Sequence, residues 1–149
     1  MAHSREGQAI VKQHTTEIVV ASHGPEMIEV TDRVVAWVRS TQIETGLLTL
    51  HVKHTSASLL IQENADPEVR RDFERFLRRL VPEGDPLFRH TSEGPDDMPA
   101  HVRAALTATT LSIPVTGGEP ALGTWQGIYL YEHRKHPHKR TIAAHLIGE

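Results

Sequence analysis

Apolar and polar residues alternate with period two in several short segments, and this pattern restricts the fold more than any other feature. In residues 48–52 the apolar side chains are Leu48, Leu50 and Val52, with Thr49 and His51 between them. Such alternation is typical of a strand with one buried and one solvent-facing side. Similar strands are predicted in residues 9–20, 57–62, 110–115, 126–133 and 141–147.

Helices are expected in three segments. Asp66 and Pro67 supply an N-cap and a first-turn proline for a helix whose apolar residues recur at helical spacing. These residues are Val69, Phe73, Phe76, Leu77 and Leu80. A second helix opens at Asp97, and its predicted inward stripe is Val102, Ala105 and Leu106. A third runs from Asp32 to about Ser40, with Thr31 as its cap.

The predicted strands and helices do not alternate regularly along the chain. This order favours one α+β domain over residues 1–149, in which an antiparallel, sandwich-like β core carries helices packed on one side. The N-terminal stretch MAHSREGQAIV lacks the apolar segment of a signal peptide, and no apolar run is long enough to span a membrane. We therefore expect a cytoplasmic protein without membrane contact.

Composition excludes several classes of site. The 149 residues contain no cysteine, which removes disulfides and every thiolate-containing metal site. A transition-metal site must therefore use some of the 11 histidines together with Asp or Glu. The formal charge of -3 and the scarcity of aromatic residues for base stacking do not favour nucleic-acid binding.

The positions of two histidines follow from the predicted strand and helix in which they lie. His54 continues the inward face of the 48–52 strand; the alternative is a strand-end histidine bonded to a backbone carbonyl. His101 lies four residues after Asp97 in the first helical turn, where free N–H groups disfavour a charged imidazole. Asp97 is interpreted as a helix cap, and the alternative for His101 is an ordinary surface histidine.

Two loops also contain chemically capable residues. His90 and Glu93 lie in the aperiodic loop 82–98, which offers metal ligands or, alternatively, is a solvated acidic turn. Glu132 and His133 end a strand on opposite faces. The basic turn 134–140 that follows could hold a phosphate, the alternative being a solvated hairpin loop.

Six short sequence motifs occur in a characteristic order and spacing. They are HTSASL (54–59), ENADP (63–67), EGPDDMPAH (93–101), IPV (113–115), GTWQGIYL (123–130) and EHR (132–134). From about residue 46 to the end the chain resembles the YjbQ family, small uncharacterised proteins labelled "secondary thiamine-phosphate synthase". The resemblance implies a YjbQ-like α+β fold, a homotrimer and a pocket lined by the polar residues of these motifs.

Three functions are compatible with this resemblance. The first is a metal-assisted enzyme, such as a hydrolase, in which His54, His101 and one of His90 or His133 hold a divalent ion, most simply zinc. The second is thiamine-phosphate synthesis, with magnesium on Asp96 or Asp97 and pyrophosphate on Arg134 or Arg140. The third is a non-catalytic trimeric module that binds a small phosphorylated or anionic ligand.

The expected roles divide the site residues into three groups. The catalytic candidates are Glu132, Glu93 and Asp97. The ligand-binding candidates are Thr55, Ser56, Glu63, Asn64, Arg134 and Arg140. The metal-binding candidates are His54, His90, His101 and His133.

Overall fold

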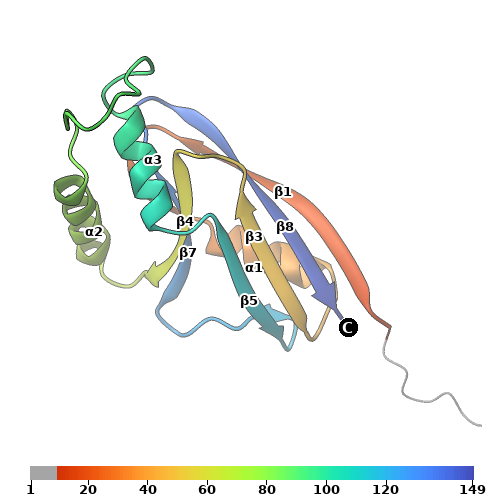
Figure 1. The fold of residues 1–149 in the computed structure, drawn as a ribbon. Helices are drawn as coiled ribbons and strands as arrows, with labels where there is room; N and C mark the ends of the chain where they lie inside the picture. Colours follow the sequence, from red (N-terminus) through yellow and green to blue (C-terminus); the bar gives the residue numbers. More distant parts are fainter. Residues whose placement is uncertain (1–9) are drawn as a thin grey trace, which may run out of the picture.

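The computed structural model describes residues 10–149 of the chain (Figure 1). Residue 9 of the first predicted strand, and most of the stretch used to argue against a signal peptide, lie outside this range. The elements are β1 (Lys12–Ser22), β2 (Glu26–Glu29), α1 (Thr31–Ser40), β3 (Gly46–Val52), β4 (Ala57–Glu63), α2 (Pro67–Leu80), α3 (Asp97–Leu106), β5 (Thr110–Thr116), β6 (Glu119–Pro120), β7 (Gln126–Glu132) and β8 (His138–Gly148).

Two antiparallel sheets share one apolar core. The larger sheet has the strand order β1-β8-β3-β5-β6, and the smaller has the order β2-β7-β4. Leu50 and Leu146 from the larger sheet and Leu59 and Leu130 from the smaller are fully buried in the same cluster. These observations confirm the predicted α+β class with an antiparallel core.

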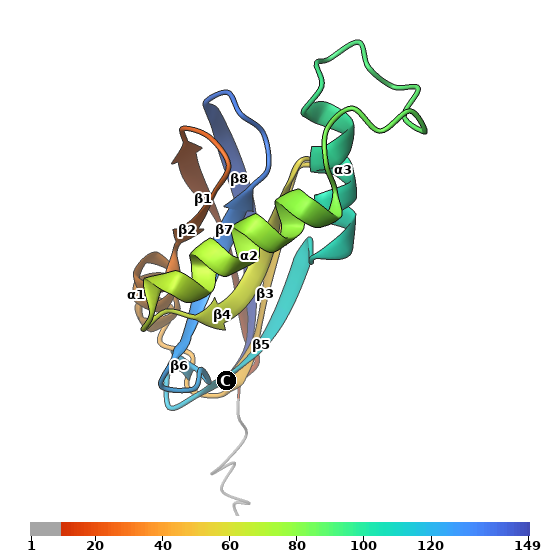
Figure 2. The ribbon, with the colours of Figure 1, turned by 90° about the vertical axis from the view of Figure 1, so that its left-hand side faces the viewer.

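The three helices occupy different places around the sheets. Helix α2 covers the outer face of the small sheet, where Leu77 packs with Tyr129 and Tyr131 (Figure 2). Helix α1 contributes Val34 and Val38 to the core between the sheets. Helix α3 lies beside the C-terminal end of α2, and the long loop 81–96 between them extends beyond the end of the sheets (Figure 2). Within residues 10–149, no helix is long and apolar enough to cross a membrane.

Several sequence predictions are confirmed and others are wrong. Leu48, Leu50 and Val52 are buried as predicted, and Asp66 accepts a hydrogen bond from the Glu68 amide at 2.9 Å as the cap of α2. In contrast, Thr31 begins α1 rather than capping it, because its hydroxyl donates to Glu29 and accepts from the Ile128 amide.

The predicted inward stripe of α3 is also wrong. The buried residues of this helix include Ala100, Arg103 and Ala104, whereas Leu106 is 57% exposed. The two small alanines allow the helix backbone to approach the sheet closely, so the contact does not follow the largest apolar side chains. The short strands β2 and β6 were not predicted, since neither has enough residues to show a period.

Candidate metal centre

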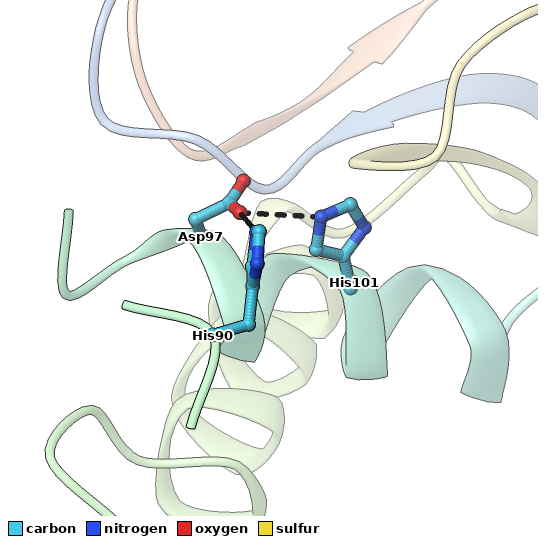
Figure 3. A group of neighbouring side chains, drawn as sticks. All are labelled: His90, Asp97 and His101. Atoms are coloured by element: carbon cyan, nitrogen blue, oxygen red, sulfur yellow. Dashed lines mark hydrogen bonds and ion pairs between the residues drawn. The ribbon is translucent and has the colours of Figure 1, made fainter. Parts of the chain in front are cut away.

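A carboxylate and two imidazoles meet at the start of α3 (Figure 3). Asp97 and His101 are four residues apart on the helix and therefore share one face. His90 reaches the same point from the loop between α2 and α3. Oδ2 of Asp97 lies 3.0 Å from Nε2 of His90 and 3.2 Å from Nε2 of His101. The three ligand atoms all lie within 4.8 Å of one another.

The hydrogen bonding of His101 leaves its Nε2 facing a carboxylate oxygen. Its Nδ1 lies 3.1 Å from the backbone carbonyl oxygen of Thr55, so Nδ1 carries a hydrogen and donates it. In a neutral ring, Nε2 would then direct a lone pair at the Asp97 carboxylate, and two acceptors would face each other. A proton or a metal ion between these atoms removes the conflict.

The distances suit a metal ion. A tetrahedral zinc site with bonds of about 2.0–2.1 Å separates its ligand atoms by roughly 3.3 Å, close to the 3.0 and 3.2 Å found around Asp97. The bond from His101 Nδ1 to a backbone carbonyl is the usual outer contact of a metal-binding histidine. The Asp97 side chain is 2% exposed, whereas that of His90 is 51% exposed. One side of the group is therefore open to solvent.

Arg134 holds the two aspartates in place. Its Nη1 donates to Oδ1 of Asp97 at 2.7 Å, its Nε donates to Oδ2 of Asp96 at 3.0 Å, and its Nη2 donates to the Glu93 carbonyl. Burial alone would raise the pKa of Asp96, but the Lys135 amide and the Arg134 guanidinium outweigh it and lower that pKa. The carboxylate of Asp96 therefore stays ionised in a buried position.

These contacts correct two interpretations of the acidic loop. Asp97 does not act as the N-cap; that position is Asp96, which makes no side-chain cap bond, and the Asp97 carboxylate bonds to Arg134 and the histidines instead. The loop end is not a solvated acidic turn, because Asp96 and Asp97 are both buried. The arginine that neutralises them lies 37 residues further along the chain than Asp97, a pairing that local sequence does not reveal.

A second polar cluster lies between the two sheets and is distinct from the metal group. Glu132 is fully buried and receives hydrogen bonds from Nε and Nη2 of Arg140, at 2.8 and 2.9 Å. Ser22 donates to Glu132, and Ser56 accepts from Arg140. Arg140 was expected in a basic turn that could hold a phosphate or, alternatively, in a solvated hairpin loop; it instead belongs to β8, whose alternation directs it inward at the sheet end. The carboxylate of Glu132 therefore has a structural role as the ion-pair partner of Arg140.

His54 and His133 do not join the metal group. Nε2 of His54 accepts a hydrogen bond from the Thr141 amide at 3.2 Å, so its backbone partner is an amide rather than the carbonyl considered from sequence. Burial, and then the charge of Arg140, lower the pKa of His54. His133 lies on the opposite face of the small sheet from Glu132, as the alternation predicted, and its Nε2 is 2.9 Å from the Ser58 hydroxyl.

The remaining candidates are spread over two ends of the small sheet. The Thr55 carbonyl contacts His101, and the Ser56 hydroxyl contacts Arg140. Glu63 is the last residue of β4 and pairs with Gln126, the first residue of β7. Asn64 follows it directly. Seven residues of strand span roughly 20 Å, so within one chain Glu63 and Asn64 are remote from the metal group.

Comparisons with known proteins agree with the fold. A family profile described as "UPF0047 protein YjbQ-like" matches residues 14–149. A UPF0047 protein of Synechocystis sp. is 48% identical over 141 residues, which are 95% of this chain and 96% of the relative. UPF0047 protein YjbQ of Escherichia coli O157:H7 is 49% identical over 108 residues, which are 72% of this chain and 78% of the relative.

Solved structures show the same architecture. A hypothetical protein from Aeropyrum pernix K1 has a TM-score of 0.83 at 30% identity, covering 91% of this chain and 99% of that one. A YbjQ-like protein of unknown function from Sulfolobus solfataricus P2 has a TM-score of 0.86, covering 94% and 100%. At 23% identity the second match concerns the fold alone.

Proposed function

The chain belongs to the UPF0047 YjbQ-like family, and from this premise we propose that it is a small-molecule enzyme whose reaction depends on a divalent metal ion held by His90, Asp97 and His101. The observation that carries the proposal is the arrangement of Asp97, with one carboxylate oxygen facing two imidazole nitrogens and the other fixed by Arg134. That arrangement supplies three ligands and an outer partner that orients one of them.

The ligand types favour zinc or a similar transition ion over magnesium. Imidazole nitrogen suits zinc, iron and copper, whereas magnesium takes oxygen ligands almost exclusively. Catalytic zinc sites commonly use three protein ligands and leave a fourth position for water or substrate. An ion at this position would supply Lewis-acid chemistry to a substrate oxygen or to water.

The substrate is proposed to enter beside His90. A cavity of about 230 Å³ adjoins this histidine and is lined mainly by the loop, including Phe88 and Pro95, with Met98 from α3. Of the two glutamates considered as general base, Glu132 is bonded to Arg140 inside the protein. Glu93 is exposed in the same loop as His90, and we assign it the role of base in a metal-dependent hydrolysis.

Thiamine-phosphate synthesis receives less support from the geometry. That reaction requires cationic groups free to neutralise a departing pyrophosphate. Arg134 already donates through Nε, Nη1 and Nη2 to neighbours within the chain, and Arg140 is bonded to Glu132 and Ser56. Hydrolysis at a two-histidine, one-carboxylate centre needs neither arginine to be free.

The metal proposal is tested on tag-free protein purified without chelator. Elemental analysis should find about one transition-metal ion per chain. His101→Ala and Asp97→Asn should weaken zinc affinity by at least about 100-fold, and Arg134→Met by about 10–100-fold as the loss of an outer partner. His14→Ala, which removes an exposed histidine of β1, is the matched control and should leave the affinity unchanged.

Two results separate metal binding from catalysis. If wild-type protein holds no metal and binds none on reconstitution, the centre proposed here does not exist. If metal binds but the loaded protein hydrolyses none of a panel of p-nitrophenyl esters and phosphodiesters faster than His101→Ala does, the hydrolase assignment fails and a binding role takes its place. Glu93→Gln should lower turnover while leaving the metal content unchanged.

Self-association into a homotrimer is a further part of the proposal. It is supported by apolar side chains on the face of the large sheet opposite the core, where Val19, Leu47 and Ile147 are 47%, 44% and 38% exposed. Light scattering should give a mass of three times 16.6 kDa. Leu47→Lys should reduce the mass to that of one chain, and a wild-type protein that is already monomeric would contradict the trimer.

A further inference from the structure

Arg103 is an unusual residue for the buried side of a helix. Its side chain is buried on the face of α3 that meets the end of α2, and only 8% of its surface is exposed. Nη2 donates to the carbonyl oxygen of Val81 at 2.6 Å. The buried Nε has no hydrogen-bond partner among the described residues. An unpaired buried donor on a charged group costs free energy, and residues 10–149 provide no acceptor for it.

The same arginine lines a cavity of about 320 Å³ between α2, α3 and the end of β7. This volume is within the usual range for small-molecule sites, about 300–1,000 Å³. Arg78 from α2 and Lys135 from the segment after β7 also line the cavity, together with His133 and the acidic residue Glu83. The C-terminal end of α2 and helix α3, which form two of its walls, lie side by side in Figure 2.

The cavity has an excess of unpaired positive charge. Lys135 is paired with Glu83 at 2.6 Å, and Asp96, the other acidic lining residue, is paired with Arg134. Arg78 makes no ion pair within residues 10–149, and neither does Arg103.

The two free guanidinium groups act on each other. Burial has the largest effect and lowers the pKa of Arg103; Tyr131, Glu83 and Asp96 oppose this, and the positive charge of Arg78 adds to the lowering. Two cations without ion pairs therefore face one cavity, and an anion between them would relieve the repulsion and accept hydrogen bonds from the guanidinium groups.

We propose that this cavity is a binding site for a phosphoryl group, held between Arg78 and Arg103. A phosphoryl group suits the site better than a carboxylate, because its additional oxygens can accept from both guanidinium groups at once. The site is separate from the metal centre. Arg103 follows His101 by two residues and thus points roughly 200° away around α3, toward α2 rather than toward His90.

The test is calorimetric titration with inorganic phosphate at constant ionic strength, in the presence of a chelator so that no metal contributes. Wild-type protein should bind phosphate saturably, with sodium acetate as a carboxylate probe binding at least tenfold more weakly. Glycerol phosphate, a phosphate monoester, should compete with phosphate and thereby show that the group is recognised when it is attached to a larger molecule.

Variants on α2 and α3 locate the site. Arg103→Met should weaken phosphate binding at least tenfold while keeping the fold, because methionine fills the same apolar space without an unpaired donor. Arg78→Met should weaken it severalfold and concerns an exposed residue, so the fold is not at risk. Arg75→Met, one turn earlier on α2 and paired with Asp72, is the control and should bind like the wild type.

The outcome is independent of the metal centre. His101→Ala should lose metal and keep phosphate binding, so a failure of one proposal does not imply a failure of the other. Absence of saturable phosphate binding in the wild-type protein, or equal affinity in the wild type and in both Arg103→Met and Arg78→Met, overturns the proposed site.

Discussion

His133 should make the folded protein sensitive to mild acid. The side chain is 2% exposed and contacts the Ser58 hydroxyl and the Tyr131 ring. Burial, followed by the charges of Arg103 and Arg140, lowers the pKa of His133 to about 3. The imidazole therefore remains neutral in the folded protein at any pH at which the protein is normally handled.

The sign and size of the effect follow from proton linkage. In the unfolded chain His133 has a pKa of about 6.5, so between pH 6.5 and pH 3 only the unfolded state takes up the proton. Its contribution to stability is complete above about pH 6.5 and declines as the pH falls, by about 1.4 kcal/mol per pH unit. Between pH 7.5 and pH 5 the loss from this one group is about 2 kcal/mol.

Urea denaturation at pH 7.5, 6 and 5 measures this loss. His133→Gln keeps a hydrogen-bond partner for Ser58 but cannot titrate, so its free energy of unfolding should fall by about 2 kcal/mol less than that of the wild type over this range. His54, whose pKa is also lowered, contributes equally to both proteins and cancels in the comparison. His14→Gln, at an exposed position, should behave like the wild type. If His133→Gln and the wild type lose the same stability, the neutral buried state of His133 is refuted.

Two further substitutions test the packing of the fold. Arg140→Met leaves the buried Glu132 carboxylate without its counter-charge and should cost about 3–5 kcal/mol in urea denaturation at pH 7, whereas the exposed Arg75→Met should change stability by no more than about 0.5 kcal/mol; equal losses would show that the Glu132–Arg140 pair does not hold the sheets together. Asp66→Ala removes the acceptor for the Glu68 amide at the start of α2 and should cost about 0.5–2 kcal/mol, a range that an unchanged unfolding midpoint would contradict.

Local sequence patterns predicted the elements of this fold better than their contacts. The strand 48–52 was predicted from its period-two alternation, and the helix after Asp66 from its N-cap and helical spacing. Both signals depend only on residues that are close in sequence. The inward stripe of α3 did not follow from apolarity, because two alanines and Arg103 face the protein and Leu106 faces solvent. Which face a short helix buries depends on the space its neighbours leave, and that space is set by distant parts of the chain.

The candidate site was only partly predicted, because its contacts also depend on distant parts of the chain. His90, Asp97 and His101 were all named from sequence, but Asp97 was interpreted as a cap because its position in the first turn is the local signal available. Its true partners include Arg134, 37 residues away. Arg140 resembled a solvated turn residue because basic residues surround it, yet strand alternation buries it against Glu132. Charged residues that pair with partners distant in the sequence produce no periodic pattern from which the pair could be predicted.

The most direct test of the metal centre is a crystal structure of zinc-loaded protein with anomalous diffraction recorded at the zinc edge. We predict one strong peak per chain, about 2.0–2.2 Å from Nε2 of His90, Oδ2 of Asp97 and Nε2 of His101, with Nδ1 of His101 still bonded to the Thr55 carbonyl. A peak beside His54 or His133, or none at Asp97 in fully loaded crystals, would contradict the account.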